Sequence, residues 1–181
     1  AGGAPALRLW LMDGVRPARW HPHRPGRWSA EAEWPSRHIE PRLFRLVETG
    51  LIPLQLGHDG SGETNAVIDP GELRGDMARV VASPQDCGLT GGSATFDGAP
   101  LDAPLDIVGA PQLELDFISD RPQANVAVRL CDVHPDGASE LICYGVLNLT
   151  HRHTHETPAP LVPGEVARAG VTLDQIAYRL P

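Results

Sequence analysis

Lysine is absent from this sequence, so all 15 basic side chains are arginines, and they are outnumbered by 23 aspartates and glutamates. The formal net charge is therefore −8. A surface with this excess of negative charge repels phosphate backbones. The only local concentration of arginine lies between residues 16 and 27. We therefore expect no nucleic-acid partner.

Long apolar runs are also missing. No stretch approaches the roughly 20 apolar residues that cross a bilayer. Residues 1–14 lack the charged start and the long apolar centre of a signal peptide. We therefore expect no membrane partner and a cytoplasmic location.

Cysteine is scarce, and Cys87, Cys131 and Cys143 are too few and too scattered for a disulfide framework. Cys131 and Cys143 lie on the two arms of one predicted hairpin, where they could be near neighbours. A disulfide between adjacent strands is strained, however. We favour two free, partly buried thiols over a bond between them.

Proline and glycine are plentiful, at 18 and 19 residues, which suits many turns between short strands better than a few long helices. Hydrophobic residues make up 41% and charged residues 21% of the chain, close to ordinary globular values. At 181 residues the chain has the size of one domain. The prediction is a single all-β domain over residues 1–181.

The stretch from Leu101 to Glu165 carries the clearest strand pattern. Apolar and polar residues alternate over 113–117 and again over 126–130, the two-residue period of half-buried strands. Pro135, Asp136 and Gly137 then predict a tight hairpin turn, and Gly145 indicates a bulge or a close backbone approach in the following strand. Further strands are expected at 6–12, 43–47, 51–56, 77–82, 141–150, 165–173 and 176–180.

Residues 13–41 lack any periodicity and predict a long loop, with one helical turn from Ser29 to Glu33 that Trp34-Pro35 ends. This loop carries two tryptophans, Trp20 and Trp28, and a His-x-His pair at 21 and 23. Three interpretations remain open: anchoring of the loop over the core, stacking on a ligand, and metal binding. Trp20, Trp28 and Trp34 are the candidate interface or ligand contacts.

A second histidine cluster, His151, His153 and His155, would share one face if the strand at 141–150 continued through it. A solvated strand end, a pH-sensitive contact and a metal site all remain open for it. Gly57 to Thr64 is not a phosphate loop, because it has no lysine and no following helix. Gly60-Ser61-Gly62 is not a nucleophile elbow. We therefore expect no catalytic residue, no cofactor and no metal site.

The chain also resembles a known family through residues that occur in a shared order: Pro100-Leu101, Asp106, Gly109-Ala110-Pro111, Leu113, Leu115, Ser119, Val128, Leu130, Asp132-Val133, Pro135-Asp136-Gly137, Ser139, Gly145, Leu147 and Pro163-Gly164-Glu165. Trp28 and Trp34-Pro35 add a similar element nearer the start. This order is similar to that of the C-terminal, non-catalytic β-sandwich domain of X-Pro dipeptidyl-peptidases and cocaine-esterase-like acyl esterases.

The resemblance implies a jelly-roll-like β-sandwich of the galactose-binding-domain-like kind, a C-terminal fragment of a larger hydrolase. The implied partner is an N-terminal α/β-hydrolase domain of the same parent chain, which would hold the serine nucleophile. The implied roles are to pack on that domain, to help shape the substrate cleft and, in some members, to form a homodimer. Whether the parent acts on esters or on X-Pro peptides stays open.

In the resembled family further strands follow the one at Ile176 to Leu180, so we expect a sandwich that lacks its last strands. Such a chain would self-associate, swap a strand, or hold its C-terminal segment away from its place in the full protein. Two other functions stay open. A carbohydrate-binding module would use the loop tryptophans, and a metal-dependent enzyme would use the histidine clusters. A shared fold does not decide among them.

Overall fold

The computed structural model describes residues 4–18, 20–47, 50–54 and 96–181. Within these ranges the chain forms ten strands and one short 3-10 helix, and no α-helix. The predicted all-β class is therefore confirmed. Three features discussed from the sequence lie outside the described residues: the stretch from Gly57 to Thr64, the strand expected at 77–82, and Cys87.

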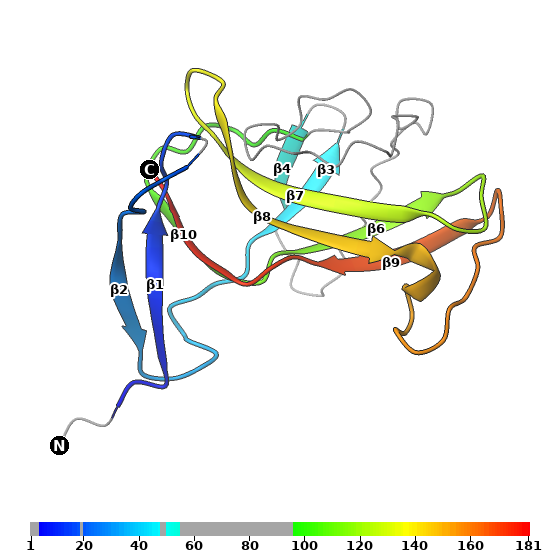
Figure 1. Cartoon of the computed structure of the whole chain (residues 1–181), viewed down its shortest axis with the longest axis horizontal. Helices are drawn as coiled ribbons and strands as arrows, with labels where there is room; N and C mark the ends of the chain where they lie inside the picture. The colour runs from blue at the N-terminus through cyan, green and yellow to red at the C-terminus, as the bar shows by residue number, and fades with distance from the viewer. Residues whose placement is uncertain (1–3, 19, 48–49, 55–95) are drawn as a thin grey trace.

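A four-stranded sheet contains the two ends of the chain. Its order is β2 (Gly26–Glu31), β1 (Leu7–Asp13), β10 (Ile176–Leu180) and β5 (Leu105–Gly109), with β1 and β10 parallel and the other pairs antiparallel. In β1 the predicted alternation holds, since Leu11 is buried and its neighbour Trp10 is partly exposed. The N-terminal strand and the C-terminal strand thus lie side by side (Figure 1).

Two long antiparallel segments connect this sheet to the rest of the fold. Only Ala110 and Pro111 separate β5 from β6 (Gln112–Ile118), and three residues separate β9 (Val166–Thr172) from β10. β6 pairs with β9 as β5 pairs with β10. Between the two ladders, the Leu173 amide donates to the Pro111 carbonyl at 2.9 Å. The two pairs therefore form one continuous ribbon.

β7 (Asn125–Val133) and β8 (Ser139–Asn148) form the predicted hairpin. Gly137 has a φ of 82°, and its amide donates to the His134 carbonyl at 2.8 Å. The positive φ confirms the tight turn. The register shifts at Leu130/Cys131, so that Ile142 is an extra residue on β8. The bulge therefore lies three residues before Gly145.

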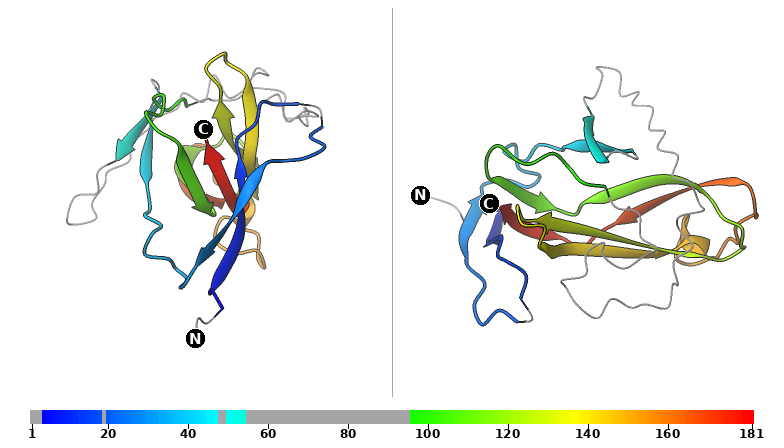
Figure 2. Two further views of the ribbon diagram at one scale, coloured as in Figure 1. Left: turned by 90° about the vertical axis from the view of Figure 1, so that its left-hand side faces the viewer. Right: turned by 90° about the horizontal axis from the view of Figure 1, so that it is seen from above.

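Gly145 is instead the point of close backbone approach between β8 and β9. A Cβ atom on it would lie 2.8 Å from the Thr172 carbonyl oxygen. Around this approach the hairpin packs on the β6–β9 pair through two apolar clusters, centred on Cys143, Val171 and Leu173 and on Leu149, Leu161 and Ala169. The pairs form a sandwich-like arrangement, seen from two further sides in Figure 2.

The predicted helical turn at Ser29 to Glu33 is wrong. Residues 26–31 form β2, in which Ser29 pairs with Leu9 rather than capping a helix. A cap contributes about 1 kcal/mol, less than a six-residue ladder against β1. The predicted hairpin at 43–56 is confirmed where it is described, by β3 (Leu43–Val47) and β4 (Gly50–Leu54).

The predicted strand at 141–150 ends two residues earlier than expected and does not continue through the histidine cluster. β8 ends at Asn148, whose side chain accepts from the Thr150 amide and caps a 3-10 helix over Leu149–His151. The chain then turns away, so His151, His153 and His155 do not share a strand face. The strands expected at 165–173 and 176–180 are confirmed as β9 and β10.

Candidate functional site

One exposed surface on the regular strands is aromatic. Trp10 on β1 and Trp28 on β2 are directly paired in the ladder, with ring centroids 5.5 Å apart and an edge-to-face angle of 73°. The Arg8 guanidinium lies 5.9 Å from the centre of the Trp28 ring. Trp28 remains 67% exposed and Trp10 37% exposed. We call Arg8, Trp10 and Trp28 the aromatic surface.

The backbone at Gly26 explains where the Trp10 indole can lie. A Cβ atom at Gly26 would be 2.4 Å from the Leu11 carbonyl oxygen and 2.7 Å from Trp10 Nε1. Only glycine leaves that space, so the Trp10 ring covers Gly26 directly. At this edge of the sheet the Trp10 indole therefore packs on the backbone of Gly26, and the Trp28 indole packs against the Trp10 ring.

The other tryptophans do not join this pair. Trp20 is 75% exposed in the loop that precedes β2, and Trp34 is 53% exposed in the bend that follows it. Trp28 was expected in a loop, and its partner Trp10 was not among the candidate contacts. The strand predicted at 6–12 puts Trp10 on the side opposite Leu9 and Leu11, but its pairing with Trp28 became visible only once residues 26–31 formed a strand.

Next to β2, the structure brings together a serine, a glutamate and a histidine. Ser36 Oγ donates to Glu31 Oε2 at 2.6 Å, and His38 Nδ1 lies 3.0 Å from the same oxygen. The Ser36 hydrogen bond, and then the His38 contact, hold the pKa of Glu31 below its usual value near 4.5. In a hydrolase triad the histidine must stand between the hydroxyl and the acid. Here the carboxylate stands between them, so the cluster braces the bend and does not activate a nucleophile.

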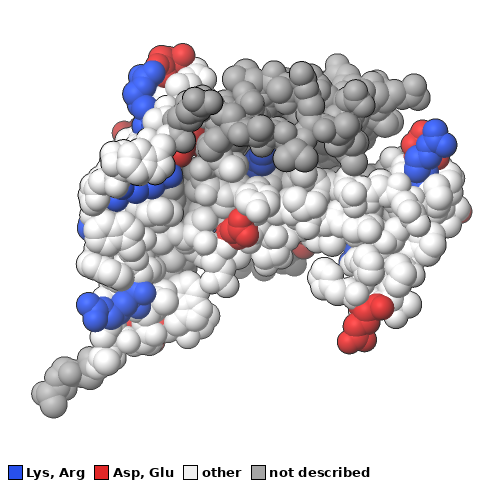
Figure 3. Space-filling model, in the orientation of Figure 1, with Lys and Arg blue, Asp and Glu red and all other residues white. Residues whose placement is uncertain are grey.

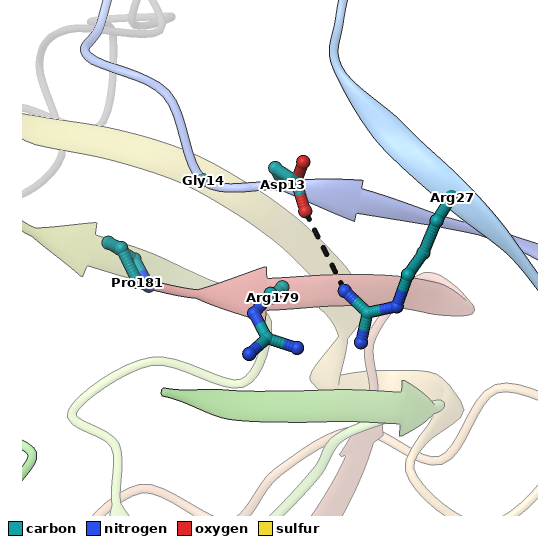
Figure 4. Close-up of a pocket in the computed structure, with 5 residues that line it drawn as sticks. All are labelled: Asp13, Gly14, Arg27, Arg179 and Pro181. Carbon is teal, nitrogen blue, oxygen red and sulfur yellow. Dashed lines mark ion pairs between the residues drawn. The ribbon is translucent and has the colours of Figure 1, made fainter. Parts of the chain in front are cut away.

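Four charged side chains form a row across the four-stranded sheet. Asp106 on β5 accepts from Arg27 on β2 at 2.8 Å and from Arg179 on β10 at 3.1 Å, while Asp13 on β1 lies 4.0 Å from Arg27. With Gly14 and Pro181, three of them line a shallow pocket of about 370 Å³ (Figure 4). Two arginines balance two aspartates, so the row braces the sheet and leaves no unpaired positive charge for an anion.

On the opposite face, a buried polar cluster joins this sheet to the β7–β8 hairpin. The hydroxyl of Tyr178, which is fully buried, donates to Asp132 Oδ2 at 3.0 Å. Burial, and then the Asp132 charge, raise the pKa of Tyr178. Arg24 donates to Glu140 at 3.0 Å and lies 5.7 Å from the centre of the Tyr178 ring. These four residues fix the sheet against the sandwich.

The histidines are spread over separate sites. His21 and His23 lie in the loop before β2, and the His151 and His155 rings stack with centroids 6.4 Å apart. Within the described part of the chain, no group of three or more His, Cys, Asp or Glu side chains is arranged to hold a metal ion.

The cysteines correct one expectation. Cys131 is disulfide-bonded, so the prediction of two free thiols is wrong at this position. Cys143 is free and buried, as expected, so the less favoured Cys131–Cys143 bond does not form. Burial, and then the nearby Asp174 charge, raise the pKa of Cys143 to about 11. Among the described residues no helix is long and apolar enough to span a bilayer.

Comparisons with known proteins point to hydrolases. The chain is 24% identical over 204 residues to cocaine esterase of Rhodococcus sp. (strain MB1 Bresler), covering 97% of this chain and 31% of that protein. It is 26% identical over 178 residues to "Putative serine esterase Mb1866c" of Mycobacterium bovis (strain ATCC BAA-935 / AF2122/97), covering 84% of this chain and 28% of that protein. The chain thus spans about a third of the length of these curated relatives.

A crystal structure of an aminopeptidase from the marine sediment archaeon Thaumarchaeota archaeon is similar over 45% of this chain and 15% of its own length, with 22% identity and a TM-score of 0.40. The model of one family, described as the X-Pro dipeptidyl-peptidase C-terminal non-catalytic domain, matches residues 2–181. That match covers nearly the whole sequence, includes every strand described above, and agrees with an all-β chain in which the one Ser–Glu–His cluster is not connected as a triad. The chain belongs to the family of X-Pro dipeptidyl-peptidase C-terminal non-catalytic domains.

Proposed function

We propose that this domain packs against an α/β-hydrolase-type catalytic domain of the same protein and helps to shape its substrate cleft or a homodimer interface. The observation that carries the proposal is the amount of apolar side chain left in water by the described strands. Seven large side chains are more than half exposed on or beside regular strands: Trp28, Trp34, Ile118, Val133, Tyr144, Val146 and Val166. Exposed apolar side chains mark an interface where they form a continuous patch, as the Trp28 ring does with the Trp10 ring.

The surrounding surface supports the same proposal. On the face shown in Figure 3, charged side chains form a few small groups, and uncharged side chains fill most of the described surface between them. Domain interfaces within one chain are depleted of charge at their centre and enriched in aromatic residues. The described part of this face, with its few charged groups, therefore fits a neighbouring domain.

The chemistry of the whole protein is part of the proposal. We infer that the catalytic part is a serine hydrolase, either an acyl esterase or an X-Pro dipeptidyl-peptidase, because both curated relatives are named as esterases and the family is named after a peptidase. The reacting serine would lie outside this domain, since Ser36 has the carboxylate of Glu31 where a base is needed.

The test compares three samples: this chain alone, the catalytic part alone, and the two joined in one protein. We expect the chain alone to hydrolyse neither p-nitrophenyl esters nor X-Pro chromogenic peptides above background. The joined protein should have a higher Tm for its catalytic part, or a changed KM. Turnover by the repurified chain that a fluorophosphonate abolishes would overturn the assignment, and so would a catalytic part that is unaffected by removal of this domain.

A second candidate function rests on Trp20, which is 75% exposed in its loop. Exposed indoles can stack on sugar rings, as in a carbohydrate-binding module. Saturable quenching of tryptophan fluorescence by soluble glycans, lost in Trp20→Ala, would support that function. Absence of quenching across a panel of hexose oligomers would exclude it for those sugars.

A further inference from the structure

Two exposed apolar faces that include an aromatic side chain compete as the contact to the catalytic part. One is the aromatic surface of Arg8, Trp10 and Trp28. The other is the outer face of the β7–β8 hairpin, where Tyr144 is 52% and Val146 is 63% exposed. The two lie on different strand pairs. The proposed function requires only that the catalytic domain covers one face of this domain. The composition and geometry of the two faces indicate which one.

The aromatic surface has the composition that binding interfaces concentrate at their centres. Tryptophan and arginine are the residues most enriched among interface positions of high binding energy, whereas valine is under-represented there. Trp10 is fixed over Gly26, and Trp28 is fixed edge-on against Trp10. A surface that is already ordered loses little side-chain entropy when a partner covers it. The hairpin face has one tyrosine and one valine, and among the described residues Tyr144 makes no ring contact like that between Trp10 and Trp28.

The charge on this surface indicates the chemistry of its partner. Arg8 makes a cation–π contact with Trp28 and forms no ion pair with a carboxylate of the described residues. A partner that covered Arg8 without a carboxylate would bury an unpaired charge, which is costly. The fitting partner therefore presents an apolar ridge to the two indoles and an aspartate or glutamate to Arg8.

The position of the surface in the fold also favours this face. β2 is an edge strand of the four-stranded sheet, so one side of its backbone is open to a partner. β1 is the first strand, and in this family the non-catalytic domain is C-terminal, so the preceding part of a member leads into β1. Figure 1 shows β1 and β2 standing together at one end of the molecule. A tethered partner has its highest effective concentration close to the point of attachment.

We propose that Arg8, Trp10 and Trp28 on the β1–β2 ribbon form the docking surface for the catalytic domain of the same protein, which contributes an apolar ridge and a carboxylate that pairs with Arg8. This inference rests on the proposed function. It adds which of the exposed faces the catalytic domain covers, and which groups that domain contributes to the contact.

The first experiment is amide hydrogen exchange on this chain alone and on the full-length hydrolase that contains it. We expect residues 26–31 to exchange more slowly in the full-length protein, while the outer strand positions around Tyr144 and Val146 exchange at the same rate in both. This comparison needs no substitution, so a variant that fails to fold cannot confuse it.

The second experiment places Trp28→Ser and Arg8→Glu in this chain and measures its association with the catalytic part supplied separately. Tyr144→Ser and Arg121→Glu are matched controls at other exposed positions. Binding energy concentrated at such residues predicts that Trp28→Ser weakens association of the separated parts by about tenfold or more. The controls should change it less than about twofold. Circular dichroism and the Tm of each isolated variant establish that it is folded.

The outcomes separate the two proposals. Slower exchange in β2, together with weaker association of Trp28→Ser, would support the docking surface. Protection confined to the β7–β8 hairpin, with Tyr144→Ser as the damaging variant, would overturn this inference and leave the proposed function standing. No protection anywhere in the domain would overturn the proposed function itself. Protection of β2 by a soluble glycan, and not by the catalytic part, would overturn both.

Discussion

At the scale of single residues, the glycines of this domain have distinct tasks that the backbone makes visible. Gly137 has a φ of 82° with no atom near the place of a Cβ, so only backbone conformation requires glycine there. At Gly26 space and not backbone conformation requires glycine, because the Leu11 carbonyl and the Trp10 indole occupy the place where a Cβ would lie. The same residue type thus closes a hairpin at one site and seats an aromatic ring at another.

We expect Gly137→Val to destabilise the domain by about 1 kcal/mol or more, because a β-branched residue is strained at positive φ. Gly137→Asn is the matched control, since asparagine tolerates the left-handed region. Chemical denaturation of both variants measures the difference. Equal free energies of unfolding for the two variants and the parent would show that the turn changes its geometry at no cost.

Cys143 should resist alkylation in the folded protein. Its side chain is 3% exposed, and its pKa is raised to about 11, so little thiolate exists at pH 8 and reagents do not reach it. After iodoacetamide treatment, mass spectrometry should find the peptide that contains Cys143 unmodified in the native chain and alkylated in the denatured chain. Rapid modification under native conditions would contradict the packing around β8.

At the scale of elements, the fold depends on how closely the strands of the sandwich approach one another. Gly145 on β8 lies against the Thr172 carbonyl of β9, and the Asp174 amide donates to the Tyr144 carbonyl at 3.0 Å. These contacts join the hairpin to the long ribbon at one point. The bend after β2 is a second such feature, held by hydrogen bonds to Glu31.

Gly145→Ala should destabilise the domain by about 1–3 kcal/mol, because the new methyl group would lie 2.8 Å from a backbone oxygen that has little freedom to move. Gly170→Ala on β9 provides the control, since no atom lies within 4 Å of its Cβ position. Thermal unfolding of both variants tests this. A larger loss in Gly170→Ala than in Gly145→Ala would refute the close approach.

Protonation of the Glu31 carboxylate should lower the free energy of unfolding at acid pH. Its pKa is lower in the folded chain than the usual value near 4.5, so its contribution is present above that value and is lost as the pH falls through the folded pKa. Glu31→Gln should lower the Tm near neutral pH and flatten the dependence of Tm on pH below about 4.5. Glu33→Gln, in the same bend, should keep the slope of the parent. An unchanged acid slope in Glu31→Gln would exclude this contribution.

At the scale of the whole molecule, the buried polar cluster of Arg24, Asp132, Glu140 and Tyr178 decides how the four-stranded sheet sits on the sandwich. Asp132 and Glu140 are both less than 5% exposed, and each has a partner from the other unit. A docking surface on β1 and β2 can support a catalytic domain only if these strands are held in place. The cluster is therefore the structural support for the proposed contact.

Arg24→Met should destabilise the chain by about 3 kcal/mol, because it leaves the Glu140 carboxylate buried without its cation. The double variant Arg24→Met with Glu140→Gln should recover part of that loss, since the unpaired charge is then gone. A double-mutant cycle by chemical denaturation measures the coupling between the two. Strictly additive effects would mean that the pair does not act as a unit.

Periodicity and turn chemistry were enough to predict the all-β class, β1, the β7–β8 hairpin and the strands at 166–172 and 176–180, because each depends on neighbours close in sequence. Tertiary structure decided the features that local rules cannot reach. Ser29 to Glu33 carries a helix-start signal, but the ladder to β1 outweighs a single cap. His151 leaves the strand because Asn148 caps a 3-10 turn. The pairing of Trp10 with Trp28, and of Arg24 with Glu140 116 positions away, came only from the folded arrangement of distant strands, since no local pattern specifies which strand lies beside which.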